Sequence, residues 1–139
     1  MTNDGEVTNY SWGTVGTDTT VTVTDNDGTD AVVVTDPAVG RPVSVTNASG
    51  NPVTYEYYPS GLLKKVTLPE GNYIYYDRDD RGNAFGVYHV PKDPLVDPTI
   101  TTLADYDTTC TDTVTCNKPN YIIDPNGNRT DYTLSLIHI

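Results

Sequence analysis

Glycine recurs at a nearly constant interval through the middle of this chain, at Gly40, Gly50, Gly61, Gly71 and Gly82. Every second glycine marks one full repeat of about 21 residues, a length typical of stacked repeat proteins. Each step between glycines holds a short segment of alternating residues and ends at a turn. A fixed period of this kind indicates an array of similar units. The chain is therefore predicted to be a β-repeat scaffold.

Alternation within the steps predicts short strands. In the segment Val53–Tyr57, the residues Val53, Tyr55 and Tyr57 fall on one face and Thr54 and Glu56 on the other. In the next segment Leu62, Val66 and Leu68 are expected to share a face with Lys64. Turns containing Pro and Gly separate the segments, and glycine suits them because such turns need a positive φ. An all-β antiparallel meander is predicted, with strands near Val43–Thr46, Val53–Tyr57, Leu63–Leu68 and Tyr73–Tyr76.

The composition narrows the possible partners. The 19 acidic and 8 basic residues give a formal net charge of −11, which opposes binding to nucleic acid or to an anionic membrane. No apolar run approaches the ~20 residues that span a bilayer. The opening residues lack the basic and apolar regions of a secretory signal, so we expect the natural N-terminus to lie upstream.

Several spacings together carry a family resemblance. Gly50, Tyr55, Tyr57 and Gly61 are followed by Val66, Pro69 and Gly71, and the next unit repeats the pattern at Tyr76, Asp79 and Gly82. The pattern starts again at Gly127 and Tyr132. This arrangement resembles the tyrosine–aspartate (YD) repeat of the rearrangement-hotspot (RHS) proteins. Tyr58 and Glu70 stand where the family motif has Asp, and Arg78 stands where it has its second Tyr.

The resemblance organises the chain into five segments. We expect a degenerate β-repeat region at 1–39, YD repeats at 40–83, a Pro- and Thr-rich excursion that interrupts the period at 84–120, and the start of a further YD repeat at 121–133. Residues 134–139 are expected to be a non-native tail on a truncated gene, because they look like the translation of a sequencing adaptor.

A structural role is what the resemblance implies. In RHS proteins such repeats form a spiralling sheet that closes into a shell, and in bacteria this shell commonly encloses a toxic C-terminal domain. The expected partner is therefore the remainder of the same polypeptide, and the expected location is outside the cell or on its surface. No cofactor is expected.

Two cysteines lie inside the excursion, at Cys110 and Cys116. Their spacing and the lack of further Cys or His ligands argue against a zinc or redox motif. The remaining alternatives are a disulfide that pins the excursion and a pair of free thiols.

No acid–base constellation stands out. His89 lies in a strand-like run without a nucleophile elbow or HExxH motif, and Asp77, Asp79 and Asp80 lie in one charged turn. The chain is therefore expected not to be an enzyme. The rival function is a calcium-binding or adhesive extracellular β-repeat, suggested by the acidic run 25–30, although Val23 and Val34 would occupy the first and last ligand positions of an EF-hand there.

Overall fold

The computed structural model describes residues 8–24, 28, 30–38 and 40–133. These residues form eleven β-strands and no helix, which confirms the all-β prediction. Accordingly, none of them belongs to a helix that could span a membrane. The chain divides into two compact units, Met1–Gly71 and Asn72–Ile139, and the division falls inside the segment predicted to hold the YD repeats.

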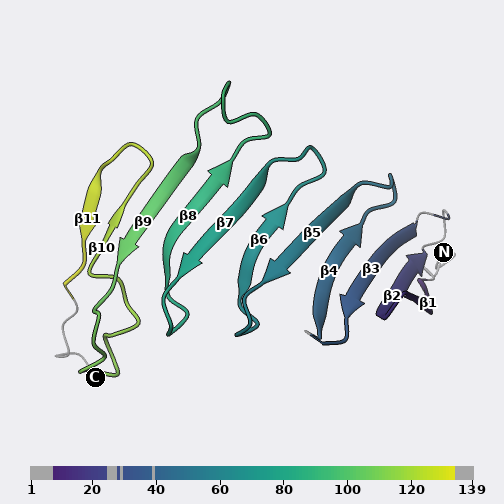
Figure 1. Cartoon of the computed structure of the whole chain (residues 1–139), viewed down its shortest axis with the longest axis horizontal. Helices are drawn as coiled ribbons and strands as arrows, with labels where there is room; N and C mark the ends of the chain where they lie inside the picture. The colour runs from purple at the N-terminus through teal and green to yellow at the C-terminus, as the bar shows by residue number, and fades with distance from the viewer. Residues whose placement is uncertain (1–7, 25–27, 29, 39, 134–139) are drawn as a thin grey trace, which may run out of the picture. The chain divides into compact units, whose positions relative to one another are not determined.

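The first unit is an antiparallel meander in which each strand pairs with the next along the chain (Figure 1). Three of its six strands coincide with the predicted ones to within two residues. The strands are β1 (Asn9–Val15), β2 (Asp18–Thr24), β3 (Asp30–Asp36), β4 (Arg41–Thr46), β5 (Pro52–Tyr57) and β6 (Leu63–Thr67).

The second unit repeats this arrangement, again with each strand beside its neighbour in sequence. Its strands are β7 (Tyr73–Arg78), β8 (Ala84–Val90), β9 (Ile100–Asp105), β10 (Tyr121–Ile123) and β11 (Arg129–Asp131). Both β8 and β9 lie within the predicted excursion 84–120. The interruption is therefore confined to two connections, residues 91–99 and 106–120.

The turns share one backbone design. The five evenly spaced glycines have φ between 66° and 96°, and Gly127 has φ 84°. From Gly50 onward, each of these glycines donates its N–H to the carbonyl oxygen three residues earlier, at distances of 2.8 to 3.0 Å. The left-handed backbone costs glycine little, since it has no Cβ, and this closes each hairpin in the same way.

A β-bulge recurs with the period of the glycines. In the β3–β4 pair Val34 lies opposite Ser44 but Thr35 lies opposite Pro42, which leaves Val43 as the extra residue. The same shift leaves Lys64 extra in β6 and Phe85 extra in β8. These three residues follow one another at intervals of one full repeat, the interval from Gly40 to Gly61. The bulge therefore belongs to the repeat, and a bulge bends its strand and increases the local twist.

The bulge in β6 changes which residues share a face, so the prediction for Leu62–Leu68 was wrong in part. Alternation holds in β5, where Val53, Tyr55 and Tyr57 are half-buried between exposed neighbours. In β6, Val66 lies opposite Tyr55 as alternation requires, but Leu63 lies opposite Tyr57 because Lys64 is the extra residue. Strict alternation from Leu62 to Leu68 is therefore interrupted at Lys64.

The first unit has an apolar face without a closed core. Directly paired positions place Trp12, Val21, Val33, Val45 and Val53 in one row across five strands. The four valines are half-buried and Trp12 is exposed. Over all described residues, Cys116 is the one buried hydrophobic side chain. Lateral pairs, each worth roughly 0.2–1 kcal/mol, therefore carry much of the packing energy.

We predict that Gly50→Ala destabilises the protein by about 1–2 kcal/mol, the usual cost of a left-handed backbone for a residue with a Cβ. A Cβ at Gly50 would have no atom within 4 Å, so no clash contributes to this cost. Gly50→Asn should lose less, since Asn tolerates this conformation. Urea unfolding measures both, and an Ala variant as stable as the parent would contradict the turn assignment.

Candidate functional site

The most elaborate polar site of the described chain is built on the turn between β7 and β8. Asp79 Oδ1 accepts hydrogen bonds from the backbone N–H groups of Arg81 (3.0 Å) and Asn83 (2.9 Å). Its Oδ2 accepts from the Asn83 side-chain amide (2.9 Å) and from the Arg81 guanidinium (3.1 Å). Short acidic side chains favour turns because they bond their own backbone in this way.

Two other turns use the same design. Asp124 accepts from the backbone of Asn126 and Asn128 and from the Asn128 side chain, at 2.8 to 2.9 Å. Asn47 accepts from the backbone N–H groups of Ser49 and Asn51, both at 3.0 Å. A side-chain oxygen at the first position of the turn is therefore common to three hairpins.

The turn that begins at Tyr58 has the same backbone hydrogen bonds as these turns but a different side chain at its first position. Tyr58 N–H donates to Leu62 O (2.9 Å) and Gly61 N–H donates to Tyr58 O (2.8 Å), the same backbone bonds as in the Asp79 turn. Tyr58 has no carboxylate to accept from the turn. The glycine and the backbone bonds thus suffice to form the hairpin, and the carboxylate adds bonds to it.

The carboxylates in these turns are held ionised. Burial acts to raise the pKa of Asp79, but hydrogen bonds from Asn83 and Arg81 outweigh it and lower the pKa below its usual value. Hydrogen bonds from Asn128 lower the pKa of Asp124 in the same direction, against a smaller effect of desolvation. A carboxylate that accepts several N–H bonds favours its charged form. Both groups serve as hydrogen-bond acceptors at neutral pH.

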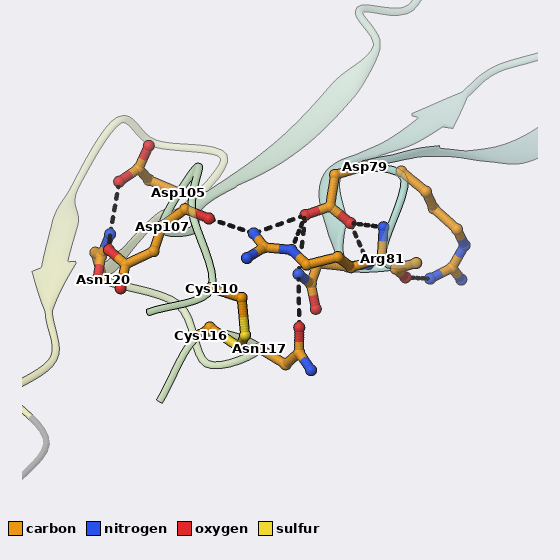
Figure 2. A network of polar contacts seen from close by, with 11 residues as sticks. Asp79, Arg81, Asp105, Asp107, Cys110, Cys116, Asn117 and Asn120 are labelled. Carbon is orange, nitrogen blue, oxygen red and sulfur yellow. Dashed lines mark hydrogen bonds and ion pairs between the residues drawn. A yellow bond between two sulfur atoms is a disulfide. The ribbon is translucent and has the colours of Figure 1, made fainter. Parts of the chain in front are cut away.

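The Asp79 turn also joins the connection between β9 and β10, residues 106–120 (Figure 2). The Arg81 guanidinium donates to the backbone carbonyl of Asp107, and the Asn83 side chain donates to Asn117 Oδ1 (3.3 Å). The two contacts lie on opposite sides, in sequence, of the disulfide between Cys110 and Cys116, whose S–S distance is 2.02 Å. The disulfide closes the part of the loop that lies between the two contacts.

Asn120 holds the far end of the same loop. Its side-chain amide donates to Asp105 Oδ2 and to Asp107 Oδ1, both at 3.1 Å, and its backbone N–H donates to Asp105 O (2.7 Å). Asn120 O in turn accepts from Tyr132 N–H (2.8 Å). This residue therefore links β9, the loop and the residue after β11.

An open groove of about 450 Å³ lies beside the network. It is lined by the β7–β8 turn, by Phe85 and by the residues that leave β9, including Asp105 and Asp107. Several of its acidic groups are already engaged by Arg81, Asn83 and Asn120. The described residues hold no group of three or more His, Cys, Asp or Glu suited to a metal ion. The chemistry seen here is structural hydrogen bonding within a surface groove.

Comparison with known protein families identifies the repeat. The RHS Repeat family model matches residues 36–72. This chain contains an RHS repeat. The matched segment includes two of the bulges, at Val43 and Lys64, and four of the evenly spaced glycines. No curated protein matches the chain.

In the segment that matches the RHS repeat, the predicted structural residues lie on neighbouring strands and in the turns between them. Tyr55 lies opposite Val66. The Tyr57 hydroxyl donates to Pro42 O (2.8 Å), and the Arg41 guanidinium lies 5.7 Å from the centre of the Tyr57 ring. The second tyrosine of the motif thus connects β4 and β5 through its hydroxyl and its ring.

The remaining motif residues occupy turns and neighbouring strands. Gly40 and Gly50 lie in the turns on either side of β4, and Pro69 and Gly71 follow β6. A Cβ at Gly61 would lie 3.3 Å from the Arg41 guanidinium. Tyr76 lies in β7 opposite Val87, with the Arg78 guanidinium 5.4 Å from its ring centre. Gly82 closes the Asp79 turn and Gly127 closes the Asp124 turn.

Of the residues considered for catalysis, Asp79 and Asp80 line the groove beside the β7–β8 turn, whereas His89 lies on β8 and is not among the residues that line it. His89 is exposed and lies opposite Ile74 and Ile100. Asp77 lies on β7 near Tyr88, where burial raises the pKa of the Tyr88 hydroxyl and the hydrogen bond and charge of Asp77 raise it further. Most of the acidic run considered for calcium, and the tail 134–139, lie outside the described residues.

Sequence reasoning missed the part played by Asn83, Asn117 and Asn120. The role of Asn83 could have been predicted from the sequence. Asn47, Asp79 and Asp124 are each followed by Gly three residues later and by Asn four residues later. The hydrogen bonds of the Asn117 and Asn120 side chains connect residues that are 13 to 34 positions apart in the sequence. No local sequence pattern predicts such contacts.

We predict that Asp79→Ala costs about 1–2 kcal/mol, a typical loss for a capping side chain. Asp79→Asn should lose less, because its carbonyl oxygen can still accept from both backbone N–H groups, as Asn47 does. The parent's carboxylate contribution is complete above the unfolded pKa of about 3.9 and is lost as the pH falls through the lower folded value. Denaturation between pH 2 and 7 measures both effects, and an equal loss in the two variants would contradict the assignment.

Replacing Cys110 and Cys116 by Ser should loosen the loop before the sheet. The chain-entropy model gives ~2–3 kcal/mol for so short a closed loop. Hydrogen exchange should rise first in residues 106–120 and in the Asp79 turn, with β7 and β8 still protected. Thiol labelling of the unreduced parent should find no free cysteine. Two labelled thiols, or unchanged exchange in the double variant, would contradict this role.

Proposed function

We propose that this chain is a structural segment of an RHS/YD-repeat β-shell. In this proposal the shell encloses or presents a toxin or effector domain of a much larger bacterial protein that is secreted or held at the cell surface. The chain acts by holding its sheet together and by presenting one face to what the shell surrounds. The remainder of the same polypeptide is its principal partner.

The observation that carries the proposal is the coincidence of two periods. The glycine turns and the β-bulges recur with the same repeat, and the family match covers two of the three bulges and four of the five evenly spaced glycines. A bulge at the same point of every repeat bends the sheet in the same sense each time. Regular bending of a meander is what a wall around a space requires.

The second support is the form of the sheet. The first unit has an apolar row of half-buried valines and an opposite face that carries many Thr and Ser residues. A sheet with one apolar and one more polar face suits a wall with water on one side and protein on the other.

A non-enzymatic role is part of the proposal. The carboxylates of the Asp79 and Asp124 turns are occupied by several hydrogen bonds each, and these lower their pKa values. A general acid at neutral pH needs the opposite shift. Their geometry supports a role in shaping hairpins.

Limited proteolysis of the native gene product tests the shell. We expect any effector domain of that product to be cleaved slowly in buffer and rapidly once denaturant opens the repeat sheet, as read by mass spectrometry of timed samples. An effector domain digested equally fast in both conditions would contradict enclosure.

A calcium titration by calorimetry tests the rival role. The shell proposal expects no tight binding by the chain and no change in its unfolding midpoint with EDTA. A stoichiometric site whose occupancy stabilises the fold would favour a calcium-dependent adhesive module and reject the shell.

A further inference from the structure

The disulfide in the connection 106–120 presents its two cysteines unequally to solvent. Cys110 is exposed, whereas Cys116 is only 2% exposed and is the one buried hydrophobic side chain among the described residues. The Cys110 end of the bridge is therefore the end that a thiol in solution can reach. This difference determines where thiol–disulfide exchange begins, because its rate depends on access to the attacked sulfur.

A tight turn between the two cysteines brings them together. The Asp112 carbonyl oxygen accepts hydrogen bonds from the N–H groups of Thr115 (3.2 Å) and Cys116 (2.9 Å), and Asp112 Oδ1 accepts from Val114 N–H (2.8 Å). The Cα atoms of the two cysteines lie 4.9 Å apart. The bridge thus closes a small unit with its own hydrogen bonds, and Cys116 is the buried end of that unit.

The bridge also connects two contacts with the β7–β8 turn (Figure 2). That turn donates hydrogen bonds to the carbonyl oxygen of Asp107, which precedes Cys110 by three residues, and to Oδ1 of Asn117, which directly follows Cys116. While the bridge is closed, a short covalent path through the two sulfurs joins these contacts. Once it opens, the path runs through every residue from 107 to 117, and ordering this longer segment costs more entropy. Opening the bridge therefore weakens both contacts.

We propose that Cys110 is the site at which a thiol reductant attacks, and that the bridge is a redox switch that a dithiol opens. The thiolate of the dithiol attacks Cys110 Sγ, the bond between the two cysteine sulfurs breaks, and Cys116 leaves as a thiolate that takes up a proton. The second thiol of the reductant then attacks the reductant's own sulfur in the mixed disulfide and releases Cys110. Two electrons and two protons pass to the cysteines, and the dithiol ends as a disulfide.

A monothiol such as glutathione does not hold this switch open. Its mixed disulfide at Cys110 lies beside the released Cys116 thiol, which attacks Cys110 Sγ and expels the glutathione. Because the Asp112 turn keeps the two cysteines close, this reclosure is intramolecular and outcompetes a second glutathione molecule. The second thiol of a dithiol also reacts intramolecularly, so a dithiol completes the reduction.

The consequence for the cell rests on the proposed function. A protein that is secreted or held at the cell surface forms its disulfides in an oxidising environment, and it meets dithiol reductants on entering a cytosol. The switch is then closed outside the cell and open inside a cell that receives the protein. Opening releases the hold of residues 106–120 on the β7–β8 turn, while the pairing of β7 with β8 remains.

The position of the mixed disulfide identifies the attacked sulfur. The folded chain is treated with glutathione and alkylated at early times, so that Cys116 can no longer expel the glutathione, and its peptides are then analysed by mass spectrometry. We expect at least about tenfold more glutathione on Cys110 than on Cys116, because access decides the rate. In denaturant the two should agree within about twofold, which controls for intrinsic reactivity. Equal modification in the folded chain, a majority on Cys116 or no adduct at all would overturn the proposal.

Hydrogen exchange measures the effect of opening the bridge. Dithiothreitol should raise exchange in residues 106–120 by at least about tenfold and leave β7 and β8 protected. The double variant Cys110→Ser, Cys116→Ser is the matched control, since it has no bridge, and its exchange should change by less than about twofold on adding dithiothreitol. Glutathione at the same thiol concentration should leave most of the parent closed. Unchanged exchange after the bridge has opened, loss of protection in β7 and β8, an equal response of the variant, or equal opening by glutathione would overturn the proposal.

These two measurements can fail independently of the proposed shell. Both are made on this chain, whereas enclosure is measured by proteolysis of an effector domain. Unchanged exchange in residues 106–120 together with a protected effector would reject the switch and leave the shell. A loosened loop together with an effector digested equally fast in buffer and in denaturant would support the switch and reject the shell.

Discussion

The reversal of the chain at evenly spaced glycines is the constraint on which the structure depends. Each of these glycines has a positive φ, and from Gly50 onward its N–H bonds the carbonyl three residues earlier. This geometry is cheap for glycine and costly for other residues. Because the backbone performs the reversal, the side chain at the first position can vary from Asp79 to Tyr58 without loss of the hairpin.

Side-chain oxygens then adjust the strength of individual turns. Asp79 accepts hydrogen bonds from the side chains of Arg81 and Asn83. The same two side chains also donate hydrogen bonds to the loop that carries the disulfide. Asp124 makes the same kind of bonds to the backbone and side chain of its own hairpin. The Asp124 turn thus stabilises its own hairpin, whereas the Asp79 turn stabilises its hairpin and also holds the connection formed by residues 106–120.

Much of the strand pattern could be predicted from the sequence because strands and turns are local. Alternation placed Tyr55 and Tyr57 on one face, and the glycine spacing located the hairpins. The bulge at Lys64 was not predictable from alternation, because an extra residue interrupts the period that alternation relies on. The bonds from Arg81 to the loop depend on how residues 106–120 fold back, which no short motif specifies. The Pro- and Thr-rich composition of 84–120 concealed β9, whereas the strand-like run around His89 had already indicated part of β8.

The spacing of the bulges limits the insertions and deletions that a repeat sheet of this kind can accommodate. Val43, Lys64 and Phe85 occupy equivalent positions in successive repeats. Gain or loss of one whole repeat adds or removes a complete hairpin with its bulge, and in the remaining strands each residue stays on the same face of the sheet. A shift of a single position within a strand would exchange those faces from that point onward. We therefore expect such a sheet to accommodate the gain or loss of whole repeats without a change in how its strands pack.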